Sequence, residues 1–508
     1  MEMTSFNLAD EPWIDVAGHP RQSLRQFFTG GGEFRNFGGN AVDKMAMLRF
    51  MLALAHAAVE LPDDAAWRAL TPEVLAQKIL AYLDTWHDTF DLFGEKPFLQ
   101  FPQLRASKKA LPYSTLQPSV AVGNKSVLTN WNIAPEVRTE DLPLMLLRGC
   151  GFGLGGKKYD NSLVLSPGYR GKLNDKGKEG SGTAGVLIGF QGYLHSCLRG
   201  ETLFETIKLN MLTREEVDEM KVFQGMGRPA WENLPDGEDS PLARQYRDSY
   251  QGTLLPLDKF YLLLPEDEKI IMTDGIAYPT HLTGLADPAL TIRDVKNKKE
   301  AVWAKTQSRP WRELTAILSF IQAAGERRSP FFLSCGIRKL PREALVHVWT
   351  AGLQVSSNAG EQFISGKGDY IESDFTFPNA YIGRDSYDRF VKTMTALDGC
   401  AKELYSSVAG YFKELSDLSG ADAAAHAVAV FWEIAEKDAQ LIIDTVFAED
   451  LPDCEAPPEL LKKWRRLVGE QYGRTCAHET ARQLLAWSKC RPFTRTGAKK
   501  ESKSKTRN

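Results

Sequence analysis

Apolar residues in the last quarter of the chain recur at helical spacing, and this pattern predicts a C-terminal bundle of helices. The first expected helix, 386–415, carries its apolar stripe on Phe390, Met394, Leu397, Ala401, Leu404 and Val408. Two more helical stretches follow at 421–448 and 457–489, the second interrupted near Gly473, and proline occurs only in the connections. We therefore expect a four-helix-type bundle over residues 384–490.

Residues 1–380 mix helical and strand-like patterns, so the whole chain is predicted to be an α+β protein. The expected helices are 42–60, 72–91, 184–208, 311–324 and 341–350, and the expected strands are 259–264, 269–273 and 289–295. The charged tip Pro265–Glu268 between the first two strands indicates a β-hairpin. A large mixed N-terminal domain, 1–380, is thus followed by the helical bundle and by a basic, disordered tail at 491–508.

Composition and charge describe an ordinary globular protein. The 508 residues carry a formal net charge of −3, so any role in binding nucleic acid must come from local basic patches. The seven cysteines include no C-x-x-C pair, which argues against a zinc knuckle and favours a reducing compartment. The apolar run Met45–Val59 contains Arg49 and is too short to cross a bilayer. No signal peptide is visible, and we expect a cytoplasmic protein without a membrane partner.

The stretch Gly151–Lys157 fits the phosphate-loop pattern G-x-x-x-x-G-K. The next residue, however, is Lys158, and an ammonium group cannot replace the hydroxyl that ligates magnesium. The preceding residues 140–150 read as a short helix rather than as the buried strand that such a loop follows. A nucleotide-binding, NTPase-like enzyme is therefore the weaker alternative.

Other catalytic or metal-binding patterns are equally weak. The eight histidines form no H-x-x-x-H motif, and His87 beside Asp88 reads as a surface or half-buried residue. Cys335 lies in an apolar run and is interpreted as a core residue. We expect no catalytic residues, no metal and no cofactor.

Binding of nucleic acid fits these loops better than catalysis does. Residues 149–182 contain six basic and three acidic residues, and glycines allow a backbone to approach a phosphate or a base closely. Trp131 lies between Asn130 and Asn132, where an indole can stack on a base and amides can bond base edges. The alternative is that these loops only connect elements of an assembly scaffold and that Trp131 packs on the domain surface.

An ordered set of short motifs resembles the large subunit of the type I-E CRISPR surveillance complex, the CasA family of Cascade subunits. In chain order the motifs are FNLADEPWIDV (6–16), GEKPFLQ (94–100), the glycine loop at 151–158, LRGETLFETIKLNML (198–212), GRPAWE (227–232) and the late helical bundle. Each motif is short, but together they span nearly the whole chain.

The resemblance implies a function in CRISPR antiviral defence that is not enzymatic. Members of the family recognise the protospacer-adjacent motif in double-stranded DNA through the minor groove and promote duplex opening and R-loop formation. They also recruit the helicase–nuclease that degrades the target. The implied partners are therefore the crRNA-containing Cascade complex with its other CRISPR subunits, the target duplex and that effector.

The resemblance also assigns DNA-binding positions in this sequence. The implied contacts are the glycine loop (Gly153, Gly155, Gly156 and Lys157), a hairpin lysine (Lys269), a wedge (Ser357, Asn358 and Ala359) and, by position only, Asn130, Trp131 and Asn132. The segment 167–172 is a competing match for the glycine loop, and the register of the wedge is open by one residue. Some relatives carry a cysteine cluster near the hairpin, where this chain has PEDEK, so no zinc is implied.

Overall fold

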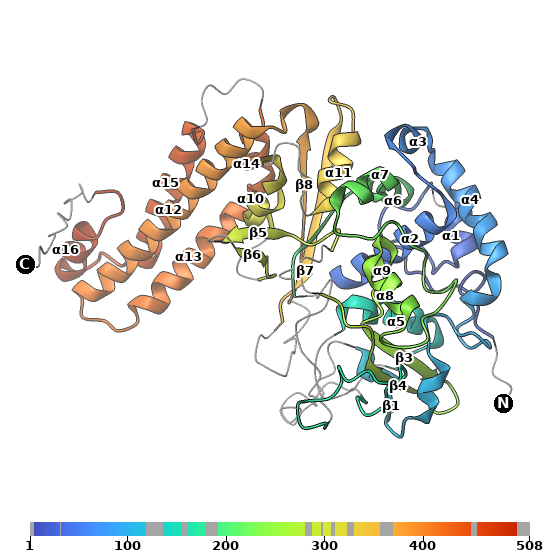
Figure 1. The fold of residues 1–508 in the computed structure, drawn as a ribbon. Helices are drawn as coiled ribbons and strands as arrows, with labels where there is room; N and C mark the ends of the chain where they lie inside the picture. The colour runs from blue at the N-terminus through green and yellow to red at the C-terminus, as the bar shows by residue number, and fades with distance from the viewer. Residues whose placement is uncertain are drawn as a thin grey trace, which may run out of the picture. The chain divides into compact units, whose positions relative to one another are not determined.

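The computed structural model describes residues 5–30, 32–117, 136–153, 160–178, 192–279, 287–295, 298–305, 310–322, 330–355, 369–448 and 455–494. The chain divides into two compact units, Met1–Phe375 and Thr376–Asn508. Figure 1 shows the first unit with mixed helices and strands and the second with helices. The expected α+β class, with a helical C-terminal region, is confirmed.

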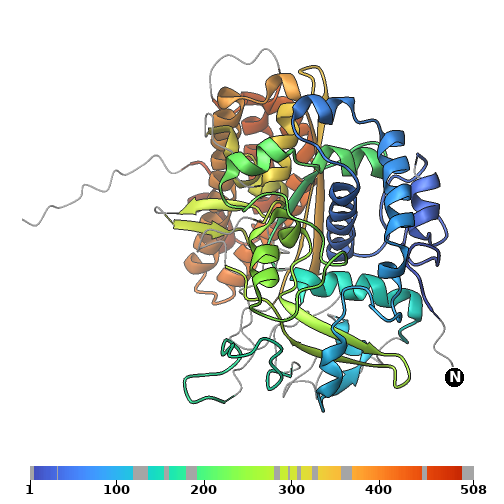
Figure 2. The ribbon, with the colours of Figure 1, turned by 45° about the vertical axis from the view of Figure 1, so that its right-hand side comes forward.

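The first unit is built around a helix that is buried nearly all round, α2 (Ala41–Ala58) (Figures 1 and 2). Asn40 caps this helix by accepting hydrogen bonds from the backbone N–H groups of Val42 and Asp43. Its neighbours are α4 (Pro72–Thr85), α5 (Leu142–Phe152), α6 (Leu203–Asn210), α9 (Tyr250–Leu254) and β7 (Leu345–Leu353). A helix without a polar face is stable only when enclosed in this way.

The other α-helices in the described part of the first unit are short. They are α1 (Leu24–Gly30), α3 (Asp64–Ala69), α7 (Arg214–Met220), α8 (Pro241–Asp248), α10 (Leu314–Ile317) and α11 (Phe331–Lys339). Cys335 of α11 is fully buried, as its apolar surroundings predict. Within the described residues, no helix is long and apolar enough to cross a membrane.

Three small sheets complete the described part of the first unit. One has the order β1 (Ala110–Pro112), β4 (Lys269–Asp274), β3 (Lys259–Leu264). Another has the order β2 (His195–Leu198), β7, β8 (Tyr370–Pro378), and the third pairs β5 (Ile292–Val295) with β6 (Lys298–Ala301). The predicted hairpin at 265–268 is confirmed, since it joins β3 and β4.

Two expected helices are wrong. The region 184–208 contains strand β2 at 195–198 before α6 begins, and the region 341–350 contains strand β7. Residues 184–191 lie outside the described ranges. These two strands pair with each other, from His195 opposite Ala351 to Leu198 opposite Val348. Long-range pairing with β7, which is rich in β-branched residues, decides the outcome here over the local helical pattern.

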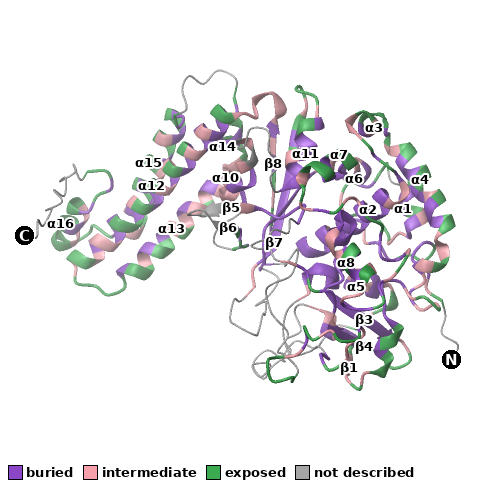
Figure 3. Cartoon of the chain, in the orientation of Figure 1, coloured by how far each residue is buried: buried purple, intermediate pink, exposed green. Residues whose placement is uncertain are grey.

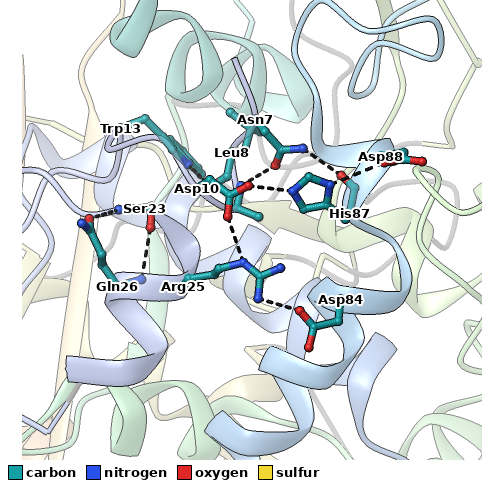
Figure 4. A network of polar contacts seen from close by, with 11 residues as sticks. Asn7, Leu8, Asp10, Trp13, Ser23, Arg25, Gln26, Asp84, His87 and Asp88 are labelled. Atoms are coloured by element: carbon teal, nitrogen blue, oxygen red, sulfur yellow. Dashed lines mark hydrogen bonds and ion pairs between the residues drawn. The ribbon is translucent and has the colours of Figure 1, made fainter. Parts of the chain in front are cut away.

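A polar network fixes the opening segment of the chain (Figure 4). Leu8 donates its backbone N–H to the carbonyl of Phe90, and Asp10 accepts from His87 Nε2 at 2.6 Å and from Arg25 Nε at 2.9 Å. The hydrogen bond with Asp10 raises the pKa of His87. His87 is a half-exposed network residue, as expected, and its stronger partner is Asp10 rather than the adjacent Asp88.

The second unit consists of α12 (Arg384–Glu414), α13 (Gly420–Lys437), α14 (Ala439–Val446), α15 (Pro458–Thr475) and α16 (Ala481–Lys489). All six residues of the predicted stripe on α12 are buried, and the buried positions face α13 and α15 (Figure 3). The stretch 457–489 is interrupted close to Gly473, as expected, because α15 ends at Thr475 and α16 begins at Ala481. Thr480 and Gln483 then form a capping box that begins α16.

A pair of leucines in the second unit tests this core. Leu404 is fully buried on α12, whereas Leu441 on α14 is 49% exposed. We expect Leu404→Ala to lower the free energy of unfolding by about 2–5 kcal/mol, because it leaves a cavity in a packed core. Leu441→Ala, the matched control, is expected to change it by less than about 0.5 kcal/mol. Urea unfolding followed by circular dichroism measures both, and equal effects would contradict the buried stripe.

Candidate nucleic-acid interface

The hairpin β3–β4 places Lys269 at an exposed position. Lys269 begins β4 opposite Leu264 of β3 and Pro112 of β1, and its side chain points to solvent while the next four residues are buried. Among the described residues it forms no ion pair. The turn before it contains Glu268 in a left-handed conformation with φ of 51°, and Glu266 of the same turn is paired with Arg105 at 3.2 Å.

Both faces of the hairpin are buried, and one of them belongs to an apolar cluster that is here called the hairpin core. Its members are Leu92, Tyr113, Leu142, Leu146, Tyr261, Leu263, Ile270 and Met272. Leu116 and Val137 pack against it as partly buried residues. They flank the segment 118–135, which contains Asn130, Trp131 and Asn132 and lies outside the described residues. The two described ends of that segment therefore rest on the same core as the hairpin lysine.

The start of the predicted glycine loop is also held by the hairpin. A Cβ at Gly149 would lie 2.6 Å from the hydroxyl of Tyr261 on β3, so a side chain is sterically excluded there. Gly151 has φ of 87°, a conformation that favours glycine, and donates its N–H to Asp258 Oδ1 at 3.1 Å. Gly153 follows and is half-buried. Gly155, Gly156 and Lys157 lie outside the described residues.

The chain beyond the glycine loop returns to the other strand of the hairpin. Asp160 donates its N–H to the carbonyl of Met272 on β4 at 2.7 Å. The Asp160 carboxylate accepts hydrogen bonds from Ser107 and from the backbone N–H of Ser162, the latter at 3.1 Å. Both described ends of the loop are therefore fixed to the hairpin, one at β3 and one at β4.

The competing segment 167–172 has a different environment from an exposed DNA contact. Its lysine, Lys172, is buried and pairs with Glu238 Oε1 at 2.6 Å. Its Nζ also donates to the carbonyl of Leu163 at 2.8 Å and to Thr273 Oγ1 at 2.7 Å. Each of the three N–H donors of the ammonium group thus has a partner inside the protein, and none is left for DNA. This geometry favours the loop at 151–158, whose contact with DNA stays a prediction.

The predicted wedge falls, in the sequence, between two strands that pair with each other. Ser357, Asn358 and Ala359 belong to the segment 356–368, which is outside the described residues and connects β7 to β8. At its base, Gln354 donates its N–H to the carbonyl of Asp369 at 2.8 Å. The segment therefore starts and ends at one place on the sheet.

Two residues at the base of these loops were missed by sequence reasoning, Asp258 and Arg148. Asp258 is buried, and its Oδ2 has no hydrogen-bond partner among the described residues. Burial raises its pKa to about 7, although the neighbouring Lys259 opposes the rise. Arg148 is buried on α5 and pairs with Asp43 at 2.9 Å. Neither residue belongs to a motif, and charged residues of this kind are recognised only when their burial is seen.

The described surroundings of the glycine loop differ from those of a phosphate-binding loop. The glycine loop follows helix α5, as expected from its sequence, whereas a phosphate-binding loop follows a strand and opens a helix. Within the described ranges no three metal-ligating side chains come together. The six cysteines in those ranges are buried, and Cys150, Cys197, Cys400 and Cys476 are free thiols.

Comparison with known proteins identifies the family. The model of the family "CRISPR-associated protein Cse1" matches residues 7–475. The structure resembles Thermobifida fusca Cse1, with a TM-score of 0.74, 17% identity and 96% of both chains covered. It resembles Thermus thermophilus CasA with a TM-score of 0.69 and 19% identity, over 96% of this chain and 98% of that one. Among curated proteins, no sequence matches this chain.

A third similar structure is described as a "CRISPR RNA-guided surveillance complex", with a TM-score of 0.69, 17% identity and coverage of 96% of this chain and 99% of that one. These likenesses place the chain in a class of large CRISPR-associated proteins with an α+β unit and a helical unit. The chain belongs to the Cse1 family, also called CasA. The resemblance drawn from its sequence is thereby confirmed.

The buried carboxyl of Asp258 predicts a pH dependence of stability. Because its folded-state pKa of about 7 lies above the ordinary 3.8, the folded state holds a proton that the unfolded state releases. This group's contribution to the free energy of unfolding therefore falls as the pH rises from about 4 to about 7 and is constant above that range. In Asp258→Asn this fall is absent, while the amide oxygen can still accept from Gly151.

We expect the stability of Asp258→Asn relative to the wild type to rise between pH 5 and pH 7 and then to level off. Thermal melts at pH 5, 6, 7 and 8 measure this difference. Asp267→Asn at the exposed hairpin tip removes a carboxyl without touching the loop and serves as the control. A difference that stays constant, or that shrinks as the pH rises, would show that Asp258 is not held protonated in the folded protein.

Proposed function

We propose that this chain is the large subunit of a type I-E CRISPR RNA-guided surveillance complex, Cascade. In this role it recognises the protospacer-adjacent motif in double-stranded DNA through the minor groove and promotes duplex opening and R-loop formation. It then recruits the helicase–nuclease. The family match and the likeness to a chain of an RNA-guided surveillance complex support the assignment.

One structural observation supports the assignment of particular residues to the DNA interface. The hairpin core supports the exposed Lys269 on one strand, both described ends of the glycine loop, and the flanks of 118–135. Three segments predicted to contact DNA are thus attached to one small apolar core. Recognition sites that read a fixed geometry such as a DNA groove require support of this kind.

The physical requirements of motif reading agree with this arrangement. The minor groove mainly distinguishes A·T from G·C, so a reader there recognises a short motif while guide pairing reads the rest. A net charge of −3 keeps nonspecific attraction to phosphates weak, and local cations such as Lys269 supply the contact. Ser357, Asn358 and Ala359 form the proposed wedge, which must offset the unstacking of a base step.

The proposal includes crRNA-bearing subunits as partners, no catalysis by this chain, and a cytoplasmic location. Free thiols such as those of Cys150 and Cys197 agree with a reducing compartment. A nucleotide-binding enzyme is disfavoured because α5 occupies the place of the strand that a phosphate loop needs. A pure assembly scaffold predicts normal DNA binding by loop variants, which the following experiments decide.

Lys269→Ala tests the hairpin contact. In the assembled complex we expect affinity for a motif-bearing duplex to fall by about 1–3 kcal/mol, the value of a good groove contact. Folding should barely change because the side chain is exposed. Lys78→Ala, an exposed lysine on α4, is the matched control and should bind like the wild type. Gel-shift titration measures both, and equal binding by Lys269→Ala and wild type would remove Lys269 from the interface.

The glycine loop is tested by Gly155→Ala/Gly156→Asp. Side chains block close approach of the backbone, and the new carboxylate repels phosphates, so motif-dependent binding to a closed duplex should be lost. Binding to a target already opened over the guide-complementary region should stay close to that of the wild type, because guide pairing no longer needs the loop.

Gel shifts on both substrates, combined with a thermal melt, separate the alternatives for this variant. Equal loss on the two substrates, or a large drop in melting temperature, would indicate misfolding instead of lost groove reading. Loss of an ATP-dependent activity would support the nucleotide-binding alternative.

A further inference from the structure

Arg148 lies where two of the segments proposed to contact DNA begin, the glycine loop and 118–135. It occupies α5, three residues before Gly151, and its side chain is 10% exposed. Nη1 pairs with Asp43 Oδ1 at 2.9 Å, and Nη2 donates to the backbone carbonyl of Leu116 at 3.0 Å. Leu116 lies two residues before the segment 118–135. The guanidinium thus joins the helix that leads into the glycine loop to the start of a second loop.

Asp43 connects the same arginine to the centre of the unit. It lies in the first turn of α2, where its Oδ2 accepts from the backbone N–H of Asn40 at 3.3 Å, while its Oδ1 takes the arginine. Both carboxylate oxygens are therefore used. Since α2 is enclosed on nearly all sides, Asp43 has a fixed position and holds the guanidinium of Arg148 in place.

Tyr370, shortly after the segment 356–368, lies within electrostatic reach of this arginine. It is the second described residue after that segment and packs on the main core as a partly buried residue. Burial raises the pKa of the Tyr370 hydroxyl, while the positive charge of Arg148 lowers it and the negative charge of Asp43 raises it. The charges of both Arg148 and Asp43 therefore affect the pKa of the Tyr370 hydroxyl.

We propose that Arg148 is a positioning residue: by holding the Leu116 carbonyl and Asp43 together, it fixes the bases of these segments relative to one another, so that they meet the closed duplex as a preformed set. This inference rests on the proposed function. Preorganisation of this kind increases affinity by lowering the ordering cost of binding. Arginine suits the role because its planar fork presents separate N–H groups to two different acceptors, whereas lysine offers a single flexible nitrogen.

A purely structural role for Arg148 has a well-matched control elsewhere in the unit. Lys339 is also a buried cation, paired with the buried Glu216 at 2.9 Å and donating to the carbonyl of Met211 at 2.8 Å. It holds no segment proposed to contact DNA. Arg148→Met and Lys339→Met therefore remove the same kinds of contact, one carboxylate and one carbonyl, from two different places.

The test measures binding of assembled complexes to a closed motif-bearing duplex and to a pre-opened target. Arg148→Met should weaken closed-duplex binding by at least about tenfold and pre-opened binding by less than about threefold. Lys339→Met should bind both like the wild type, even where its melting temperature falls as much. Arg148→Lys keeps the charge beside Asp43 and should give an intermediate loss. It replaces Arg148→Met if the latter does not fold.

Hydrogen exchange on the free full-length chain gives an independent readout. Arg148→Met should speed exchange together at 113–117 and at 369–372, whereas Lys339→Met should speed it near 211–216. Exchange unchanged at 113–117 and 369–372 in Arg148→Met, wild-type binding by Arg148→Met, or an equal closed-duplex loss in Lys339→Met would overturn the inference. A wild-type complex without motif-dependent binding would instead overturn the proposed function, and the exchange result would still decide whether Arg148 positions these segments.

Discussion

Six cross-strand pairs join β3 to β4, from Lys259 opposite Asp274 to Leu264 opposite Lys269. The pairing fixes which residues face inward, because side chains alternate along a strand and a shift by one residue would exchange the two faces. Tyr261, Leu263, Ile270 and Met272 thereby build the hairpin core, and Lys269 is left in solvent at the strand end. The glycine loop and the flanks of 118–135 are attached to this core, so their positions depend on the register of one hairpin.

Buried ion pairs provide a second set of constraints, and each joins segments that are distant in sequence. Arg148 pairs with Asp43, Lys172 with Glu238, and Arg49 with Asp287. Burying such pairs is costly, and an apolar replacement of both partners is often at least as stable, but removal of one partner leaves an uncompensated charge. In this protein the pairs lie at the bases of loops or beside them. We therefore expect these ion pairs to matter more for the positions of the loops than for the free energy of unfolding.

The glycines that make residues 149–158 look like a phosphate loop have more than one physical cause. Gly149 is required by the closeness of the Tyr261 hydroxyl, and Gly151 by its left-handed backbone. These two glycines serve packing and chain direction, not ligand binding. The loop that they introduce follows helix α5. The match of Gly151 to the first glycine of the nucleotide-binding pattern is therefore coincidental. No packing or backbone requirement of this kind is established for Gly155 and Gly156, and these two glycines are among the residues proposed to contact DNA.

Local patterns in the sequence determined the features whose contacts are close along the chain. The hairpin at 259–274, the buried helix at 41–58 and the apolar stripe of α12 were all predictable. Continuous apolar runs bounded by turn residues indicate elements that are buried on both faces, and an apolar stripe at helical spacing indicates a helix with one buried face. Ordered motifs also sufficed to recognise the family. Strands β2 and β7 were mistaken for helices because about 150 residues separate them and their pairing energy is invisible locally. Only the tertiary structure decided that Lys172 is buried and that Arg148 holds both Asp43 and Leu116, since a charged residue's burial depends on partners that folding brings from elsewhere in the chain.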